Sequence, residues 1–183
     1  QSSYASVISE MNGSGADAWV FITYQDEFTK MVNEIYSNGY EPMMYGADSV
    51  KGQSVIDGTP EGSMEGMKIV EPSAPVEQQN YQDFASAFES EYDQSPTSWA
   101  AFAYDCVINA ALAIQAADSF TGAALGDVVR DVSRPEGEKV TTFEAASDIL
   151  SDGSPSDVDY QGVSGPIDFD ENGDPVGFLQ VQE

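Results

Sequence analysis

The sequence contains no histidine, and its six lysine and arginine residues stand against 32 aspartate and glutamate residues, giving a formal net charge of −26. Nucleic-acid binding needs a basic surface, so this charge excludes it. Without histidine the chain lacks the commonest general base and the commonest transition-metal ligand. It contains no Ser-His-Asp, Cys-His or zinc-binding pattern, and we therefore expect neither a bound metal nor a cofactor.

Cysteine and long apolar runs are also scarce. The single cysteine, Cys106, excludes a disulfide within the chain. It lies in the apolar run YDCVINAALAI, where we expect it to be a small buried side chain. We expect no stretch long enough to span a bilayer and find no signal peptide. The first residues enter in the middle of a helical pattern, which indicates a portion of a longer protein.

The acidic residues are scattered among apolar residues over the whole length. Hydrophobic residues make up 41% of the sequence, enough to build a core. A net charge of this size opposes a compact state through self-repulsion, which molar salt screens to a range of about 3 Å. We therefore interpret the composition as the solvated surface of a halophilic protein. The alternative is a localised acidic binding patch.

The first 72 residues alternate between helical and extended patterns. Apolar residues recur at helical spacing, and short β-branched and aromatic runs separate the helical segments. This order predicts a parallel sheet connected by helices. The expected helices cover residues 4–11 and 28–36, the expected strands cover 16–24, 41–46 and 67–72, and the expected loop covers 47–66.

The pattern after residue 72 is mainly helical. Aromatic residues mark one face of a helix between Tyr81 and Tyr92. Ser95 and Pro96 then predict the N-cap and first turn of a long helix that ends near Ala117. Two shorter helices are expected near 122–132 and 141–150, followed by the polar break SDGSPSD.

The segment DFDENGD near the end allows two interpretations. Asp168, Asp170, Asn172 and Gly173 occupy positions one, three, five and six of a calcium-loop pattern. A working loop of this type has an acidic residue at position twelve, where this chain has Leu179, and a helix on each side. The flanks instead alternate between apolar and polar residues, and Asn-Gly predicts a hairpin with a type I′ turn. We favour the hairpin.

The order of these segments resembles the C-terminal half of type I periplasmic substrate-binding proteins. These are the branched-chain amino acid (Leu/Ile/Val-type) receptors of ABC transporters, and the acidic composition resembles a haloarchaeal version. The segments that carry the resemblance are GADAWVFITYQDEFTKMVNEIYSNGYEPMMYGAD, GMKIVEP, SPTSWAAFAYDCVINAALAIQAA and GVSGPIDFDENGDPVGFLQV.

The resemblance implies an α/β protein with doubly wound parallel sheets in two lobes, only partly present in this chain, that closes over a ligand. It assigns residues 1–72 to the end of the second lobe and 73–165 to the returning helical part of the first. Residues 166–183 would be a C-terminal hairpin at the last crossing between the lobes. In that family the ligand carboxylate is held by groups in the part that is missing here.

Two strand ends offer chemistry for a ligand, since open α/β sheets bind ligands beyond the carboxyl ends of their strands. Tyr24 follows the first strand, and Asp48 follows the second. The resemblance aligns Tyr24 with a ligand-contacting tyrosine, Asp48 with the ammonium-binding acid, and Trp99 with a pocket aromatic. Gly46 and Ser49 are secondary candidates, Gly46 because it lets the backbone approach a ligand closely. The alternatives are a solvated acid for Asp48, packing against its own helix for Tyr24 and a core position for Trp99.

The function implied by the resemblance is an extracytoplasmic, non-enzymatic receptor that delivers an amino acid, or a related small molecule, to an ABC permease. Contact with a membrane would occur only through a lipid anchor outside this chain. The alternatives are a sensory or regulatory amide- or amino-acid-binding domain of the same fold, and an acid-catalysed hydrolase with paired carboxylates.

Overall fold

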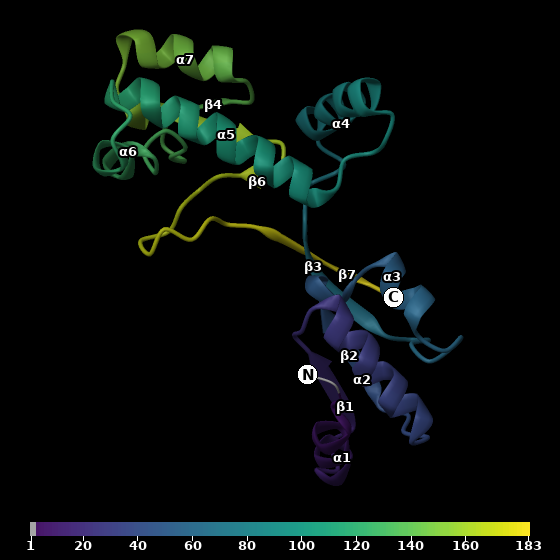
Figure 1. The fold of residues 1–183 in the computed structure, drawn as a ribbon. Coiled ribbons are helices and arrows are strands. Elements are labelled where there is room, and N and C mark those ends of the chain that lie inside the picture. Colours follow the sequence, from purple (N-terminus) through teal and green to yellow (C-terminus); the bar gives the residue numbers. More distant parts are fainter. Residues whose placement is uncertain (1–2) are drawn as a thin grey trace. The chain divides into compact units, whose positions relative to one another are not determined.

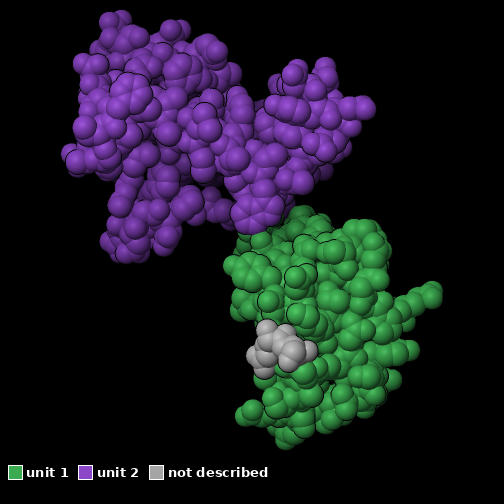
Figure 2. Space-filling view, in the orientation of Figure 1, with its two compact units in different colours: residues 1–72, 179–183 green, residues 73–178 purple. Residues whose placement is uncertain are grey.

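The computed structural model describes residues 3–183 of the chain. The chain forms two compact units, which Figure 2 shows in green and purple. Unit 1 comprises residues 1–72 and 179–183, and unit 2 comprises residues 73–178. The division places the last strand of the chain with the first 72 residues.

Unit 1 is a four-stranded sheet of order β1-β2-β3-β7, accompanied by three α-helices and one 3₁₀ helix (Figure 1). The strands β1, β2 and β3 are parallel, which confirms the predicted parallel sheet. The elements are α1 (Ala5–Gly13), β1 (Ala18–Phe21), α2 (Gln25–Ser37), β2 (Met43–Ala47), η1 (Asp48–Val50), α3 (Gln53–Gly58), β3 (Lys68–Ser73) and β7 (Phe178–Gln182).

The core of unit 1 lies between the sheet and its helices. Burial alternates along β1, where Trp19 and Phe21 are buried and Val20 is 64% exposed. The buried face of α2 packs against this side, with Phe28 in edge contact with Phe21 at a centroid distance of 5.1 Å. This alternation is what a strand covered on one face produces.

One expectation for unit 1 is wrong. Residues 47–66 do not form a plain loop, because they contain η1 and α3. The sequence of this segment shows no helical period, because α3 is short and only its Val55 is buried.

Unit 2 combines helices with a three-stranded sheet of order β4-β5-β6, in which β4 and β5 are parallel and β5 and β6 antiparallel. The predicted helices are present, whereas this sheet was not predicted. Its short strands lie in polar sequence. The elements are α4 (Gln79–Tyr92), α5 (Ser98–Ala117), α6 (Gly122–Val128), β4 (Glu138–Val140), α7 (Phe143–Asp152), η2 (Pro155–Asp157), β5 (Val158–Gly162) and β6 (Gly165–Pro166).

The long helix α5 differs from expectation in three respects. Its N-cap is Thr97, whose side chain accepts a hydrogen bond from the Ala100 N–H at 3.3 Å, and not Ser95. Cys106 is exposed and not buried. By length and composition alone α5 could cross a membrane, contrary to the sequence analysis. Two polar residues on its buried face, Asp105 and Asn109, are typical of a helix packed inside a protein.

Asp105 connects α5 to β5 and to the turn between β5 and β6. Its carboxylate, 2% exposed, accepts hydrogen bonds from the Tyr160 hydroxyl at 2.9 Å and the Val163 N–H at 3.1 Å. The N–H and hydroxyl of Ser164 donate to its second oxygen at 2.6 and 2.5 Å. Burial and the charge of Asp105 raise the pKa of Tyr160, so that the phenol stays protonated and donates. The four donors fully occupy this buried charge.

The closing segment turns back on itself as a tight hairpin loop. Phe169 bridges Pro175 in antiparallel fashion, and the Val176 N–H donates to the Asp168 carbonyl at 3.0 Å. The type I′ turn is wrong: Gly173 has φ 90°, but Asn172 does not have a positive φ. The reason is the Asp170 carboxylate, which accepts hydrogen bonds from the backbone of Asn172 at 2.8 Å and Asp174 at 2.9 Å.

These hydrogen bonds bear on the calcium-loop alternative. The bond from Asp174, with those from Asn172, lowers the pKa of Asp170, so its charge is already used to hold the turn. Within residues 3–183 no group of three or more acidic, histidine or cysteine side chains is arranged to hold a metal ion.

Candidate functional site

Tyr24 and Asp48 follow neighbouring strands at the same edge of the unit 1 sheet. The strands β1 and β2 run parallel, with Phe21 paired to Gly46 in register. Tyr24 lies beyond the end of β1 as the N-cap residue of α2, and Asp48 begins η1 directly after β2. This edge is formed by the carboxyl ends of the strands, where open α/β sheets bind their ligands.

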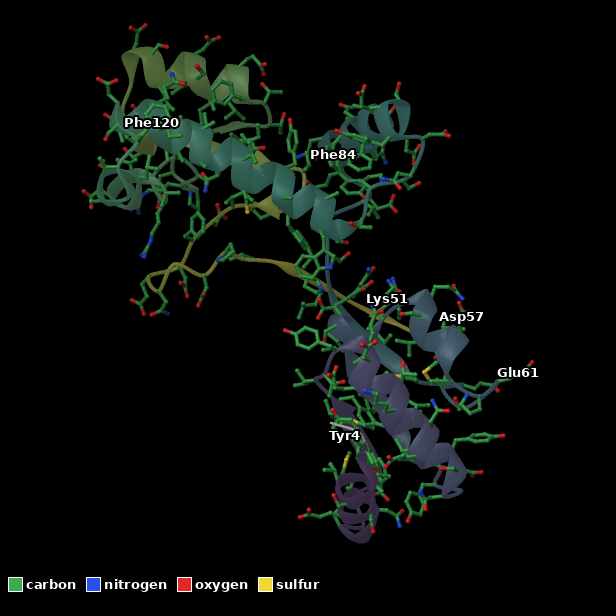
Figure 3. The ribbon with its side chains drawn as sticks, in the orientation of Figure 1. Tyr4, Lys51, Asp57, Glu61, Phe84 and Phe120 are labelled. Carbon is green, nitrogen blue, oxygen red and sulfur yellow. The ribbon has the colours of Figure 1, made fainter. Side chains whose placement is uncertain are left out.

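The Asp48 side chain is half-buried and has a free carboxylate. Within residues 3–183 it makes no hydrogen bond or ion pair; only its backbone carbonyl is used, by the Lys51 N–H at 3.0 Å. The Lys51 ammonium, at the labelled position in Figure 3, pairs with Glu71 at 2.9 Å. Gln180 of β7 donates to the same Glu71 carboxylate at 2.7 Å. The nearest lysine in the sequence is thus neutralised elsewhere, and the charge of Asp48 remains available to a cation.

Tyr24 exposes its aromatic ring at this edge. The side chain is 79% exposed, so it does not pack against its own helix, the alternative considered from the sequence. Its backbone carbonyl accepts the Phe28 N–H at 3.0 Å as the first turn of α2 begins. The backbone is therefore fixed while the ring is free to contact a ligand.

Gly46 and Ser49 have different environments. A Cβ atom at Gly46 would lie 2.5 Å from both Met67 Cε and Val50 Cγ2. Gly46 is therefore required for packing between β2 and the core, a reason other than the close ligand approach expected from the sequence. Ser49 is half-buried in η1, next to Asp48.

Trp99 belongs to unit 2, in the first turn of α5. It is 58% exposed, so it is not the fully buried core residue that the alternative interpretation required. Its ring meets Phe102 edge-on at a centroid distance of 5.7 Å. Of the five candidates, Tyr24, Gly46, Asp48 and Ser49 share the strand edge of unit 1.

A set of polar contacts at this edge was not identified from the sequence. The Gln25 side chain donates from Nε2 to the Lys51 carbonyl at 2.7 Å and accepts from the Ser54 hydroxyl at 2.5 Å. Gly52 packs directly against this amide. The only sequence signal was the position of Gln25 directly after Tyr24, since its partners come from another element.

A cavity of about 330 Å³ in unit 1 lies between α3 and the last residues of the chain, and Val50, Lys51 and Gly52, which follow Asp48, also line it. It is lined mainly by apolar side chains, including Val55 and Met64, and neither Tyr24 nor Asp48 lines it. It offers few polar groups to orient a ligand, so the strand edge remains the candidate site.

The fold is that of type I periplasmic binding proteins. The structure of a leucine-binding protein, LivK, from Thermotoga maritima matches with a TM-score of 0.72 at 18% identity, over 99% of this chain and 45% of that chain. LivJ from Streptococcus pneumoniae in complex with isoleucine matches with a TM-score of 0.63 at 21% identity, over 99% and 45%. A substrate-binding protein from Desulfitobacterium hafniense complexed with Leu matches with a TM-score of 0.61 at 24% identity, over 98% and 45%.

The sequence itself matches the family described as periplasmic binding protein over residues 1–174. The chain therefore belongs to the periplasmic binding protein family. It spans about 45% of the length of the solved relatives that it matches. No curated protein sequence is similar enough to count as a match.

Proposed function

We propose that the chain is the C-terminal portion of an extracytoplasmic receptor that binds an amino acid and delivers it to an ABC permease. Tyr24 and Asp48 are the ligand-contacting residues of this receptor in unit 1, with Ser49 beside them. The receptor has no catalytic role. The observation that carries the proposal is the free carboxylate of Asp48 at the carboxyl edge of a parallel sheet, next to an exposed tyrosine.

The chemistry of an amino acid suits this edge. Its ammonium group needs a fixed negative charge, and a charge-assisted hydrogen bond to the Asp48 carboxylate supplies one. The Tyr24 ring can cover the cation with its face or donate its hydroxyl to the ligand. Family membership supports the proposal, and so do relatives whose structures contain leucine or isoleucine.

The test is calorimetric titration of the full-length receptor, of which this chain is a portion, with L-leucine and L-isoleucine in molar KCl. Asp48→Asn removes the charge with little change in shape and should weaken binding about 10- to 100-fold. The matched control is Asp17→Asn, which removes the same charge from an exposed acid at the amino end of β1, at the other edge of the sheet. Asp17→Asn should bind like the wild type. Equal affinity of Asp48→Asn and the wild type would remove Asp48 from the site.

A further inference from the structure

The two strand-end segments that carry Tyr24 and Asp48 are joined by one side chain. Gln25 is the first residue of α2, directly after Tyr24. Its amide reaches the segment that follows β2, residues 48–52, which we call the Asp48 loop. Nε2 donates to the Lys51 carbonyl at 2.7 Å, at the end of this loop.

The same amide is held from its other side and covered. Its Oε1 accepts the Ser54 hydroxyl at 2.5 Å, from the first turn of α3. A Cβ atom at Gly52 would lie 2.5 Å from Nε2 and 2.9 Å from Oε1 of Gln25. Gly52 has φ 168° and ψ 151°, extended values that any residue adopts, so the absence of a side chain there serves the contact with Gln25 and not the backbone conformation.

We propose that Gln25 is a positioning residue that fixes the Asp48 loop relative to Tyr24, and that Gly52 leaves the space which the Gln25 amide occupies. This inference rests on the proposed function, because it holds that the hydrogen bonds of Gln25 fix the distance between the two ligand-contacting residues, Tyr24 and Asp48. A receptor gains affinity when its contacting groups are held in place before the ligand arrives, since less freedom is then lost on binding. The hydrogen bonds of Gln25 connect the first turn of α2 to Lys51 and to Ser54 of α3, and within residues 3–183 they do not use the side chain of Tyr24 or Asp48.

The experiment compares four variants of the full-length receptor: Gln25→Ala, Gln25→Glu, Gly52→Ala and the double variant Gln25→Ala with Gly52→Ala. Gln25→Glu keeps an acceptor for Ser54 but has no donor for the Lys51 carbonyl. The control is Gln53→Ala, since Gln53 is an exposed glutamine next to Gly52 whose amide, among the described residues, bonds only Asp57. Two measurements are made: hydrogen exchange of the backbone amides of residues 48–52 without ligand, and the dissociation constant for L-leucine.

We expect faster exchange in this loop and about fivefold to tenfold weaker leucine binding for each single variant at Gln25 or Gly52, and no change for Gln53→Ala. The double variant should be no worse than Gln25→Ala, because an alanine at position 52 has no amide left to displace. A merely structural effect of the Gly52 substitution would instead add to that of Gln25→Ala.

The outcomes separate this inference from the proposed function. Unchanged exchange in Gln25→Ala overturns the positioning role, whatever the ligand. Faster exchange with unchanged leucine affinity also overturns it, since the contact would then not serve the site. If the full-length wild-type receptor binds no amino acid, the proposed function fails, and the exchange measurement still decides whether Gln25 holds the loop.

Discussion

At the scale of single residues, the two acids Asp48 and Asp105 show how environment divides one side-chain type between two roles. Asp105 is buried, and its carboxylate accepts hydrogen bonds from Tyr160, Val163 and Ser164. Its charge therefore holds α5 to β5 and to the turn that follows β5. Asp48 is half-buried and has no partner within residues 3–183, so its charge is available. In a chain with 32 acidic residues, composition alone could not distinguish them.

The role of Asp105 leads to a prediction about stability. Asp105→Ala leaves the Val163 and Ser164 N–H groups and the Tyr160 hydroxyl without their acceptor in a buried position. We expect it to lower the free energy of unfolding by about 2–4 kcal/mol, measured by urea denaturation at a fixed KCl concentration. Asp127→Ala, at an exposed position of α6, should change it by less than about 0.5 kcal/mol. Equal effects of the two substitutions would contradict the structural role.

At the scale of elements, apolar periodicity was sufficient wherever an element buries one continuous face. It predicted α1, α2, α4, α5 and the three parallel strands of unit 1. It missed α3, which buries only Val55, and the sheet β4-β5-β6, whose outer strands β4 and β6 have three and two residues. The N-cap of α5 shows the same limit, because Ser95 and Thr97 are both good capping residues and only the hydrogen bond to Ala100 selects Thr97.

The position of this cap can be tested directly. Thr97→Ala removes the acceptor for the first turn of α5 and should cost about 1 kcal/mol of stability in urea denaturation. Ser95, the cap expected from the sequence, instead donates to the exposed Glu89 carboxylate at 2.6 Å. We expect Ser95→Ala to cost less than about 0.5 kcal/mol. A larger loss of stability for Ser95→Ala than for Thr97→Ala would instead make Ser95 the N-cap of α5.

At the scale of the whole molecule, charge is the dominant feature. The net charge is −26, and residues 3–183 contain three ion pairs, all but one of them between exposed or half-exposed partners. Exposed pairs of this kind contribute little, so most of the acidic surface is left to repel itself. We propose on this basis that the protein is adapted to high salt.

The salt adaptation predicts that the urea midpoint rises steadily between 0.1 and 3 M KCl, because the Debye length falls from about 10 Å to below about 3 Å. Circular dichroism would follow the transition. A variant in which the exposed acids Glu10, Asp17 and Glu41 are replaced by their amides should need less salt to reach the same midpoint. A midpoint independent of salt in both proteins would contradict the proposal.

The sequence by itself determined the local features: the acidic surface, the helices α1 and α2, the three parallel strands of the first 72 residues, and the positions of Tyr24 and Asp48 after neighbouring strands. These depend on periodicity and order along the chain, which a sequence displays directly. The tertiary structure alone decided that β7 joins the sheet of β3, that Asp105 meets the turn at Ser164, and that Gln25 packs against Gly52. Each of these contacts joins residues far apart in the chain, and no local pattern records which distant groups will meet.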